Sequence, residues 1–566
     1  MKGATMLACL ACLACLAQSR AAQAQAVLGE LPDTAAERIV ALYNRDGVTR
    51  LGGDAHLSPG SEIRGGVAVL DGTLTVEGRI SGDVIVINGD LIVRGPGGAI
   101  DGSVTVTGGQ ISIVDGGVIN GATLVYREPL RYRDEGGRIV HVLPERADEL
   151  SAGVDLPFGR TDILLSEHGA YNRVEGLPVA VGPRIRLGGS YPVTARAVLI
   201  VRTATASDAA SELDIHRFGY DVRAEQLVAP AAGLSLGVRL YSEVAAVEQW
   251  GLSDRESALA TFLLHHDQRD HYEREGWALY ATSALPGSPY SLELTYRDEE
   301  HLATAVADPF TLFYRRDAWR PEPSVAQGAL RSALLRAIYD TRNEKRDPST
   351  GWLIDAELEQ GLGGSLDNPG AIDPLLGTVE TRSARVGFGA LQVDMRRYAR
   401  LSPYARLGLR VFAAGSLDGR PLPPQRQHAL GGEGSLPGYG SFEFDCGARV
   451  NTVIVRGDTY HPYYGCDRVG LIQLEYQAGF PFMQRVTQSL GLGSSVGRLV
   501  RWVAFFDAGR AWTEPAARDG RLGGRDDFSV DTGAGLRIGP LGVYWAMPLS
   551  GSGRSPNFFV RLGPRI

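Results

Sequence analysis

The sequence has no hydrophobic run long enough to cross a membrane as a helix, although the chain contains 566 residues. A membrane-spanning helix needs about 20 consecutive apolar residues, and here every apolar stretch is broken earlier by polar or charged side chains. Basic charge is also lacking, since the formal net charge is −8. A nucleic-acid partner would require a basic surface. The sequence therefore excludes membrane-spanning helices and predicts no nucleic-acid partner.

Side chains that would carry enzyme chemistry are sparse and scattered. No two carboxylates can be assigned to one cleft, as acid–base hydrolysis would require. The run LLHHDQRDHYE at 263–273 invites a metal interpretation through His265, His266, Asp267, Asp270 and His271. On a strand, however, His265 and Asp267 share one side while His266 faces the other, and a closed zinc site needs four converging ligands. We predict no catalytic residue, no metal site and no cofactor, and we interpret the run as a polar surface loop.

Cysteine is rare, and three of the five cysteines lie in an N-terminal segment typical of a secretory signal peptide. Lys2 precedes a short apolar run, and Ala24 and Ala26 form a small-residue cleavage site. A lipoprotein signal is the alternative, but the residues before each of these cysteines fit it poorly. We predict a signal peptide at 1–26 and export from the cytoplasm.

The exported chain keeps two cysteines, Cys446 and Cys466. Disulfides persist outside the cytoplasm, and the residues around both cysteines are polar or rich in Gly and Tyr. Two free thiols in an apolar core are the alternative, which these surroundings disfavour. We predict a disulfide between the two.

Glycine is abundant, and its densest stretch is QHALGGEGSLPGYGSFEFDCGARV at 427–450. A phosphate-binding loop would lie between a strand and a helix. The residues that follow here alternate as in extended chain, so the stretch predicts a long loop between strands.

An internal repeat follows a short helical segment, which we place at 27–47. The copies IRGGVAVLDGTLTV, ISGDVIVINGDLIV and IDGSVTVTGGQISI begin at residues 63, 80 and 100. Such spacings and β-branched alternation are typical of solenoid coils that stack their inward side chains. We predict a short β-helix solenoid, with Ile85 and Val104 pointing inward. The repeats resemble the bactofilin type of polymer-forming β-helix over residues 48–126, which implies a role in spacing, self-association or binding of peptidoglycan.

The rest of the chain is predicted to be a β-barrel, which makes the whole protein all-β. After a charged linker at 127–160, segments of alternating polarity recur, as in Tyr290–Tyr296, where Leu292 and Leu294 alternate with polar residues. This alternation is typical of barrels with one lipid-facing side and one lumen-facing side. Bacterial barrels have even strand numbers, so we assign Ser441–Val455 to a loop at 415–468 and predict a 16-stranded transmembrane β-barrel over residues 161–566.

Four stretches carry a resemblance to the bacterial surface antigen superfamily. They are YNRVEGLPVAVGPRI (171–185), LGGEGSLPGYG (430–440), WVAFFDAGRAW (502–512) and DTGAGLRIGPLGVYWAMPL (531–549). The family includes the barrel of the outer-membrane protein assembly insertase and the translocation-assembly and two-partner-secretion barrels. The resemblance implies an outer-membrane location with the N-terminal domain in the periplasm, and a long sixth loop that folds back into the lumen.

The resemblance also implies two site motifs. The loop tip corresponds to Leu436, Pro437, Gly438 and Tyr439, and the lumen strand carries Phe505, Asp507 and Gly509. Relatives place an Arg in the loop tip that reaches the strand carboxylate, whereas this tip has none. A buried carboxylate needs a donor, so we expect Asp507 to pair with Arg501, Arg510 or lumen water. The alternative is an exposed Gly-rich hairpin with no role in the lumen.

Two classes of function remain open. The resemblance favours assembly or translocation of unfolded outer-membrane or exported polypeptides, with outer-membrane lipid as the surrounding partner. A structural anchor that displays the β-helix is the alternative, because the chain lacks the family's usual client-binding modules and terminal aromatic residue. A passive pore is the third interpretation.

Overall fold

The computed structural model describes residues 26–28, 31, 33–130, 132–134, 137–141, 149–156, 159–189, 191–204, 218–285, 288–313, 318–323, 325–343, 345, 347–372, 379–384, 386–402, 405–444, 446, 453–455, 458–460, 465–480, 500–513, 528–550 and 555–566. The chain divides into two compact units, Met1–Val140 and His141–Ile566, which are described separately. Of the predicted signal segment, only Ala26 lies within the described residues.

The first unit is a parallel β-solenoid, as the repeat predicts. Three stacked sheets form its sides, in the orders β1-β14-β11-β8-β5-β2, β13-β10-β7-β4 and β12-β9-β6-β3. The strands are β1 (Ala26–Leu28), β2 (Thr49–Gly52), β3 (Ala55–Leu57), β4 (Glu62–Ile63), β5 (Val67–Leu70), β6 (Leu74–Val76), β7 (Arg79–Ile80), β8 (Val84–Ile87), β9 (Leu91–Arg94), β10 (Ala99–Ile100), β11 (Val104–Thr107), β12 (Ile111–Val114), β13 (Val118–Ile119) and β14 (Thr123–Tyr126). A hairpin of β15 (Tyr132–Asp134) and β16 (Ile139–His141) follows.

An apolar column fills the solenoid, because equivalent residues of successive coils stack in register. Val84 pairs with Val104, and Val86 pairs with Val106. All four side chains belong to one buried cluster, so Val104 points inward as predicted.

The prediction for Ile85 was wrong. Ile85 is buried on the outer side of β8, in a cluster with Ala36, Ile39 and Tyr43 of α2 (Asp33–Tyr43). Because this helix covers the outer face, β8 is buried on both sides, and alternation alone could not show which residues face the column.

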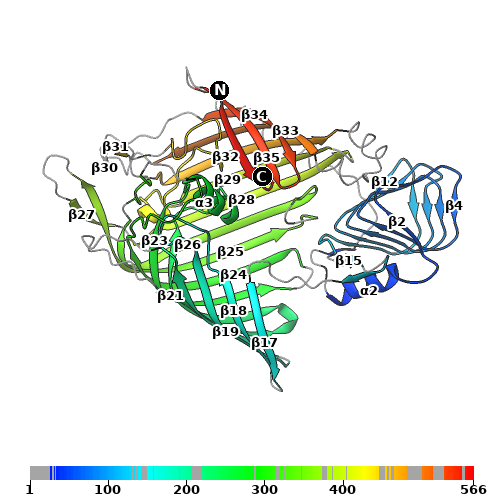
Figure 1. The fold of residues 1–566 in the computed structure, drawn as a ribbon, viewed down its shortest axis with the longest axis horizontal. Helices are drawn as coiled ribbons and strands as arrows, with labels where there is room; N and C mark the ends of the chain where they lie inside the picture. Colours follow the sequence, from blue (N-terminus) through cyan, green and yellow to red (C-terminus); the bar gives the residue numbers. More distant parts are fainter. Residues whose placement is uncertain are drawn as a thin grey trace. The chain divides into compact units, whose positions relative to one another are not determined.

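The second unit is one antiparallel sheet in which 18 strands follow in chain order from β17 to β36. They are β17 (Glu149–Leu156), β18 (Gly159–Glu167), β19 (Pro178–Leu187), β20 (Val193–Arg202), β21 (Phe218–Ala229), β22 (Leu234–Ala246), β23 (His271–Ala284), β24 (Tyr290–Leu302), β25 (Gln327–Asp340), β26 (Gly351–Ile372), β27 (Val379–Ala384), β28 (Gly389–Ser402), β29 (Ala405–Ser416), β32 (Arg468–Gly479), β33 (Val500–Trp512), β34 (Ser529–Ile538), β35 (Leu541–Pro548) and β36 (Asn557–Leu562). The sheet curves around α3 (Asp254–Leu264), which interrupts the connection between β22 and β23 (Figure 1).

The sheet has more strands than the sixteen predicted. Strand β17 lies in the stretch interpreted as a linker and pairs with β18 along its whole length. Strands β27 and β28 both pair with β26, which is 22 residues long. The described residues of the stretch 441–455, which are 441–444, 446 and 453–455, contribute no strand to this sheet. The stretch holds β30 (Val453–Val455), which pairs only with β31 (Asp458–Tyr460) in a small separate hairpin.

The two faces of the large sheet have opposite polarity. On β24, Leu292 and Leu294 are 48% and 55% exposed, whereas Thr295, which follows Leu294 and points to the opposite face, is 7% exposed. Apolar side chains that face outward and polar side chains that face inward suit a strand with lipid on one side. The alternation predicted for this segment is confirmed.

The first and last strands of the sheet, β17 and β36, each have one edge that pairs with no other strand in the described residues. β36 pairs with β35, from Leu541↔Leu562 to Ala546↔Asn557, and β17 pairs with β18. We call these two edges together the seam. Within the described part of the chain, neither helix is long and apolar enough to cross a membrane.

Candidate functional site

The long connection between β29 and β32, residues 417–467, packs against the inner face of the sheet. Leu430, Leu436 and Tyr439 are buried in a cluster with Phe412 of β29 and Leu471 of β32. Gln473 of β32 also donates a hydrogen bond of 3.0 Å to the carbonyl of Ser435. These contacts place the Gly-rich stretch inside the curve of the sheet, with its tip turned toward β34.

The loop tip is fastened by its backbone and by one hydroxyl. The Gly438 N–H donates to Oδ2 of Asp531 at 2.6 Å. The Tyr439 hydroxyl donates to the carbonyl of Val530 at 2.9 Å and also lies 2.6 Å from Oγ of Ser550. The carbonyl of Pro437 accepts a 3.1 Å hydrogen bond from Nδ2 of Asn557 on β36. The tip therefore joins β34 to the last strand without using a cationic side chain.

Two glycines explain why this stretch is glycine-rich. A Cβ atom on Gly438 would lie 2.8 Å from Cβ of Asp531 and 3.0 Å from the Pro548 nitrogen, so a side chain does not fit. Gly432 has φ +82°, a conformation that residues with a side chain rarely adopt. The first glycine allows close approach, and the second allows the chain to turn back.

The motif Phe505, Asp507 and Gly509 lies on the inner side of β33, because alternate residues of a strand share a face. Phe505 and Asp507 are buried. A Cβ on Gly509 would lie 2.9 Å from Cδ1 of Leu430, so the missing side chain leaves room for the long connection.

The cation that meets Asp507 comes from the end of the chain. Nη2 of Arg565 donates to Oδ1 and Oδ2 of Asp507 at 2.8 and 2.9 Å. The same guanidinium bonds Oε2 of Glu475 through Nε at 3.2 Å and lies 3.8 Å from the centre of the Phe505 ring. Of the two arginines expected to pair with Asp507, Arg501 pairs with Asp347 instead.

The chain end reaches the interior by a turn after β36. Gly563 has φ +110°, and the following residues carry Arg565 and Ile566 to buried positions. Cδ1 of Ile566 lies 3.5 Å from the position that a Cβ on Gly408 of β29 would take. The sequence offers no periodic signal for this contact, because a single terminal arginine belongs to no repeat or motif.

A helix that the sequence analysis missed supports the last strand. Ser253 and Glu256 form a capping box at the start of α3, a signal that the sequence S-D-R-E contains. Oε1 of Glu256 accepts hydrogen bonds from Nε of Arg561 at 2.6 Å and from the backbone N–H of Leu562 at 2.9 Å. In this way α3 satisfies a donor on the edge of β36 that faces the seam. Glu256 lies outside the strands, and although burial alone would raise its pKa, Arg561 lowers the pKa below the ordinary value.

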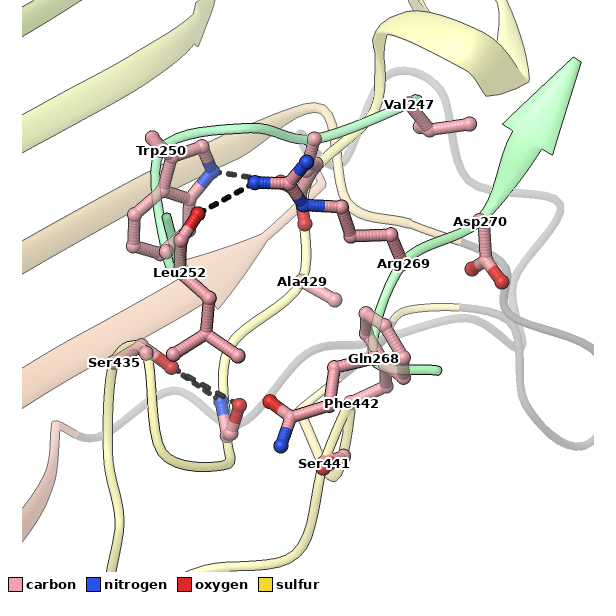
Figure 2. Close-up of a pocket in the computed structure, with 14 residues that line it drawn as sticks. Val247, Trp250, Leu252, Gln268, Arg269, Asp270, Ala429, Ser435, Ser441 and Phe442 are labelled. Atoms are coloured by element: carbon pink, nitrogen blue, oxygen red, sulfur yellow. Dashed lines mark hydrogen bonds between the residues drawn. The ribbon is translucent and has the colours of Figure 1, made fainter. Parts of the chain in front are cut away.

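The connection that contains α3 also contacts β29. Trp250 stacks on Phe412 with ring centres 4.1 Å apart, and its carbonyl accepts a 2.8 Å hydrogen bond from Arg410. Figure 2 shows Arg269 reaching the carbonyl of Leu252, a bond of 2.6 Å, beside a small cavity of about 60 Å³. A cavity of that size holds only a few waters, so we do not regard it as a ligand site.

The interpretation of the His- and Asp-rich run at 263–273 as a surface loop was wrong, because Asp267, Asp270 and His271 are buried and form ion pairs. Arg173 contacts Asp267 at 3.5 Å and Asp270 at 2.9 Å, and Glu322 lies between Arg173 and His271. Burial alone would raise the pKa of Asp267, but His271 and Arg173 lower it below the ordinary value. Within the described residues, no group of three or more His, Cys, Asp or Glu side chains is arranged to hold a metal ion.

The predicted disulfide is present. Cys446 and Cys466 are bonded, with Cα atoms 5.0 Å apart and a sequence separation of 20. The backbone of Cys466 also pairs with that of His428, through a Cys466 N–H to His428 O bond of 2.6 Å. The bond therefore fixes the second half of the long connection close to the start of β32.

The geometry defines a structural latch. Its members are Gly438, Asp531, Asn557, Asp507, Glu475 and Arg565, which bring three carboxylates, one guanidinium and the backbone of the loop tip together in the interior. The fold is thus a curved antiparallel sheet whose interior holds an inserted loop.

Residues 288–557, slightly less than half of the chain, match the Omp85 superfamily domain. The solved structures that resemble it include BamA from Haemophilus ducreyi lacking POTRA domains 1–3, with 14% identity and a TM-score of 0.42 over 74% of this chain and 75% of that chain. CdiB from Escherichia coli has 11% identity and a TM-score of 0.28 over 77% of this chain and 67% of that chain. CdiB from Acinetobacter baumannii has 9% identity and a TM-score of 0.29 over 74% and 65%. No curated protein matches the sequence.

Proposed function

We propose that this protein assembles or moves polypeptide at the outer membrane, and that the seam is the place where the polypeptide enters. The Omp85 superfamily domain supports the class of function. The single observation that carries the proposal is the edge of β36, which has no strand partner on its seam side in the described residues.

An unpaired strand edge in lipid is unfavourable, because no water is available to satisfy its backbone groups. At this edge a side chain serves instead, since Glu256 accepts the Leu562 N–H. Side-chain partners can be exchanged for the backbone of an incoming strand, as in strand addition to exposed sheet edges. The edge is thus protected at rest and available for pairing.

The latch supports this role by holding the last strand in place. Asn557 and Arg565 lie at the two ends of the terminal segment, and they are bonded to the loop tip and to Asp507 respectively. A change in the long connection is thereby coupled to the position of β36. The long connection acts as an internal plug that is bonded to the same last strand whose edge belongs to the seam.

A second candidate, a structural anchor, is favoured by the filled interior. The long connection, α3 and the chain end all bond to inward side chains of the sheet. A permanently filled barrel would only display the solenoid, which would then bind peptidoglycan or a second copy. The same filling disfavours a passive pore.

Depletion of the protein in its own cells separates the two candidates. We expect the amounts of other outer-membrane barrels to fall before envelope shape changes, and the full chain to restore them. An unchanged barrel profile together with loss of wall attachment would overturn the proposal in favour of the anchor.

A further inference from the structure

A cavity of about 540 Å³ lies beside the end of the last strand. Its lining comes from segments far apart in the chain: α3 contributes Leu259, the β25–β26 connection contributes Asp347, and the terminal segment contributes Leu562. The volume falls in the range of about 300–1,000 Å³ typical of small-molecule sites. None of these residues belongs to the latch around Asp507.

The cavity has a surplus of positive charge. The carboxylate of Asp347 forms ion pairs with three guanidinium groups. The N–O distances are 2.5 Å to Arg406, 3.0 Å to Arg501 and 2.6 Å to Arg537. One carboxylate balances only one of these three guanidinium groups. Arg537 is almost fully buried, and its Nε has no hydrogen-bond partner among the described residues. Guanidinium groups with spare donors are suited to phosphate, which accepts charge-assisted hydrogen bonds.

Apolar side chains stand next to this charge. Helix α3 buries its polar residues Glu256, Ser257 and Thr261, whereas Leu259 and Leu264 are 40% and 54% exposed. This is the reverse of the usual arrangement for a helix packed on a protein core. Leu259 and Leu562 add hydrocarbon to the same lining that contains Arg501 and Arg537.

We propose that this cavity binds a phosphate-bearing amphiphile, with its phosphate on Arg501 and Arg537 and its acyl chain against Leu259 and Leu562. The cavity lies at the end of the sheet where the connections are short, as at Gly539 and Pro540 between β34 and β35. Short turns face the periplasm in outer-membrane barrels. The ligand is therefore a phospholipid of the periplasmic leaflet, bound next to the seam.

Native mass spectrometry of the full, delipidated protein in nonionic detergent tests the proposal. Three probes distinguish its parts: dioleoyl phosphatidylglycerol has phosphate and chains, glycerol 3-phosphate has phosphate alone, and dioleoylglycerol has chains alone. We expect saturable binding of one phosphatidylglycerol and much weaker binding of the other two. Equal binding of glycerol 3-phosphate would reduce the site to a phosphate site, and equal binding of dioleoylglycerol would reduce it to an apolar one; either result overturns the proposal.

Two variants are chosen so that one should weaken and the other should tighten phosphatidylglycerol binding. Misfolding alone would weaken binding in both. The double variant Arg501→Gln/Arg537→Gln should weaken phosphatidylglycerol binding by about tenfold or more, because charge-assisted hydrogen bonds to the phosphate are lost. Asp347→Asn should tighten binding, because it removes the competing carboxylate. Arg331→Gln is the control, since Arg331 pairs with Asp298 on β24 and does not line the cavity. Unchanged affinity in both cavity variants would contradict the proposal, whether or not the barrel moves polypeptide.

Discussion

Arg565, the residue before the C-terminus, is bonded through Nη2 to both carboxylate oxygens of Asp507 at 2.8 and 2.9 Å. Both side chains are fully buried. The loop tip, where the resemblance implies a cation, instead meets the neighbouring Asp531 through the Gly438 N–H. The chain end thus supplies the cation for Asp507, and the loop tip bonds Asp531, whereas the resemblance implies that the loop alone reaches the strand carboxylate.

The first prediction concerns this ion pair. Arg565→Gln should lower the stability of the barrel by about 3–5 kcal/mol, because it leaves Asp507 buried without a partner. Urea unfolding in detergent micelles, followed by loss of heat-modifiable migration on gels, measures the change. The double variant Asp507→Asn/Arg565→Gln should recover part of the loss, since no uncompensated charge remains. Strictly additive losses would show that the two side chains are not coupled.

The second prediction concerns the glycine of the loop tip. Gly438→Ala should displace the tip and expose the long connection to protease, because its Cβ would lie 2.8 Å from Cβ of Asp531. Gly440→Ala is a matched control, since a Cβ there would lie no closer than 3.7 Å to Oε2 of Glu443. Limited proteolysis of intact cells compares the two. Equal cleavage of both variants would mean that the tip is not held against β34.

Part of the loop and strand arrangement could be predicted from the sequence, and whether a feature could be predicted depends on whether its pattern is local. The loop glycines and the Phe505–Gly509 motif are local patterns, so they could be located in advance. Helix α3 carried a readable capping box, but its exposed leucines and buried polar residues give no ordinary amphipathic pattern. Arg565 could not be assigned, because its role depends on a turn at Gly563 and on partners in β33 and β32 that lie 58 and 90 residues earlier in the chain. Ile85 was misassigned because α2 buries the outer face of its strand.

The third prediction concerns the disulfide. Reduction of Cys446–Cys466 should loosen the second half of the long connection without unfolding the barrel, whose strands are held by hydrogen bonds between neighbours in lipid. In the chain-entropy model, closing a loop of about twenty residues is worth roughly 3 kcal/mol. Mass mapping of peptides without reductant should show the bridge. Recovery of both cysteines as free thiols would contradict it.

The fourth prediction concerns the solenoid. Val104→Asp should unfold the first unit, because Val104 is fully buried in the apolar column and an unpaired carboxylate there costs several kcal/mol. Val118→Asp is the control in the same unit, since Val118 is 47% exposed. Protease sensitivity of the first unit in the full chain reports the difference. If both variants resist protease equally, the proposed register of the coils is incorrect.

The fifth prediction concerns pH and Asp347. Burial alone would raise the pKa of this carboxyl, but Arg406, Arg501 and Arg537 outweigh burial and hold the pKa well below its ordinary range. Stability from a carboxylate with a lowered pKa is fully present above the unfolded-state pKa of about 3.9 and is lost as pH falls through the folded-state pKa. Hydrogen exchange of the β25–β26 connection should therefore stay slow at neutral pH and rise only in strong acid. In Asp347→Asn this acid-induced rise should disappear.

Site-specific photocrosslinking tests most directly whether incoming polypeptide pairs with the edge of β36 at the seam. A photoreactive residue in place of Phe558 on β36 is compared with one in place of Leu294 on β24, both on the outward, apolar face and 70% and 55% exposed. The account predicts crosslinks from position 558 to newly exported outer-membrane polypeptide, and crosslinks from position 294 to lipid alone. Crosslinks to lipid alone from both positions would contradict it.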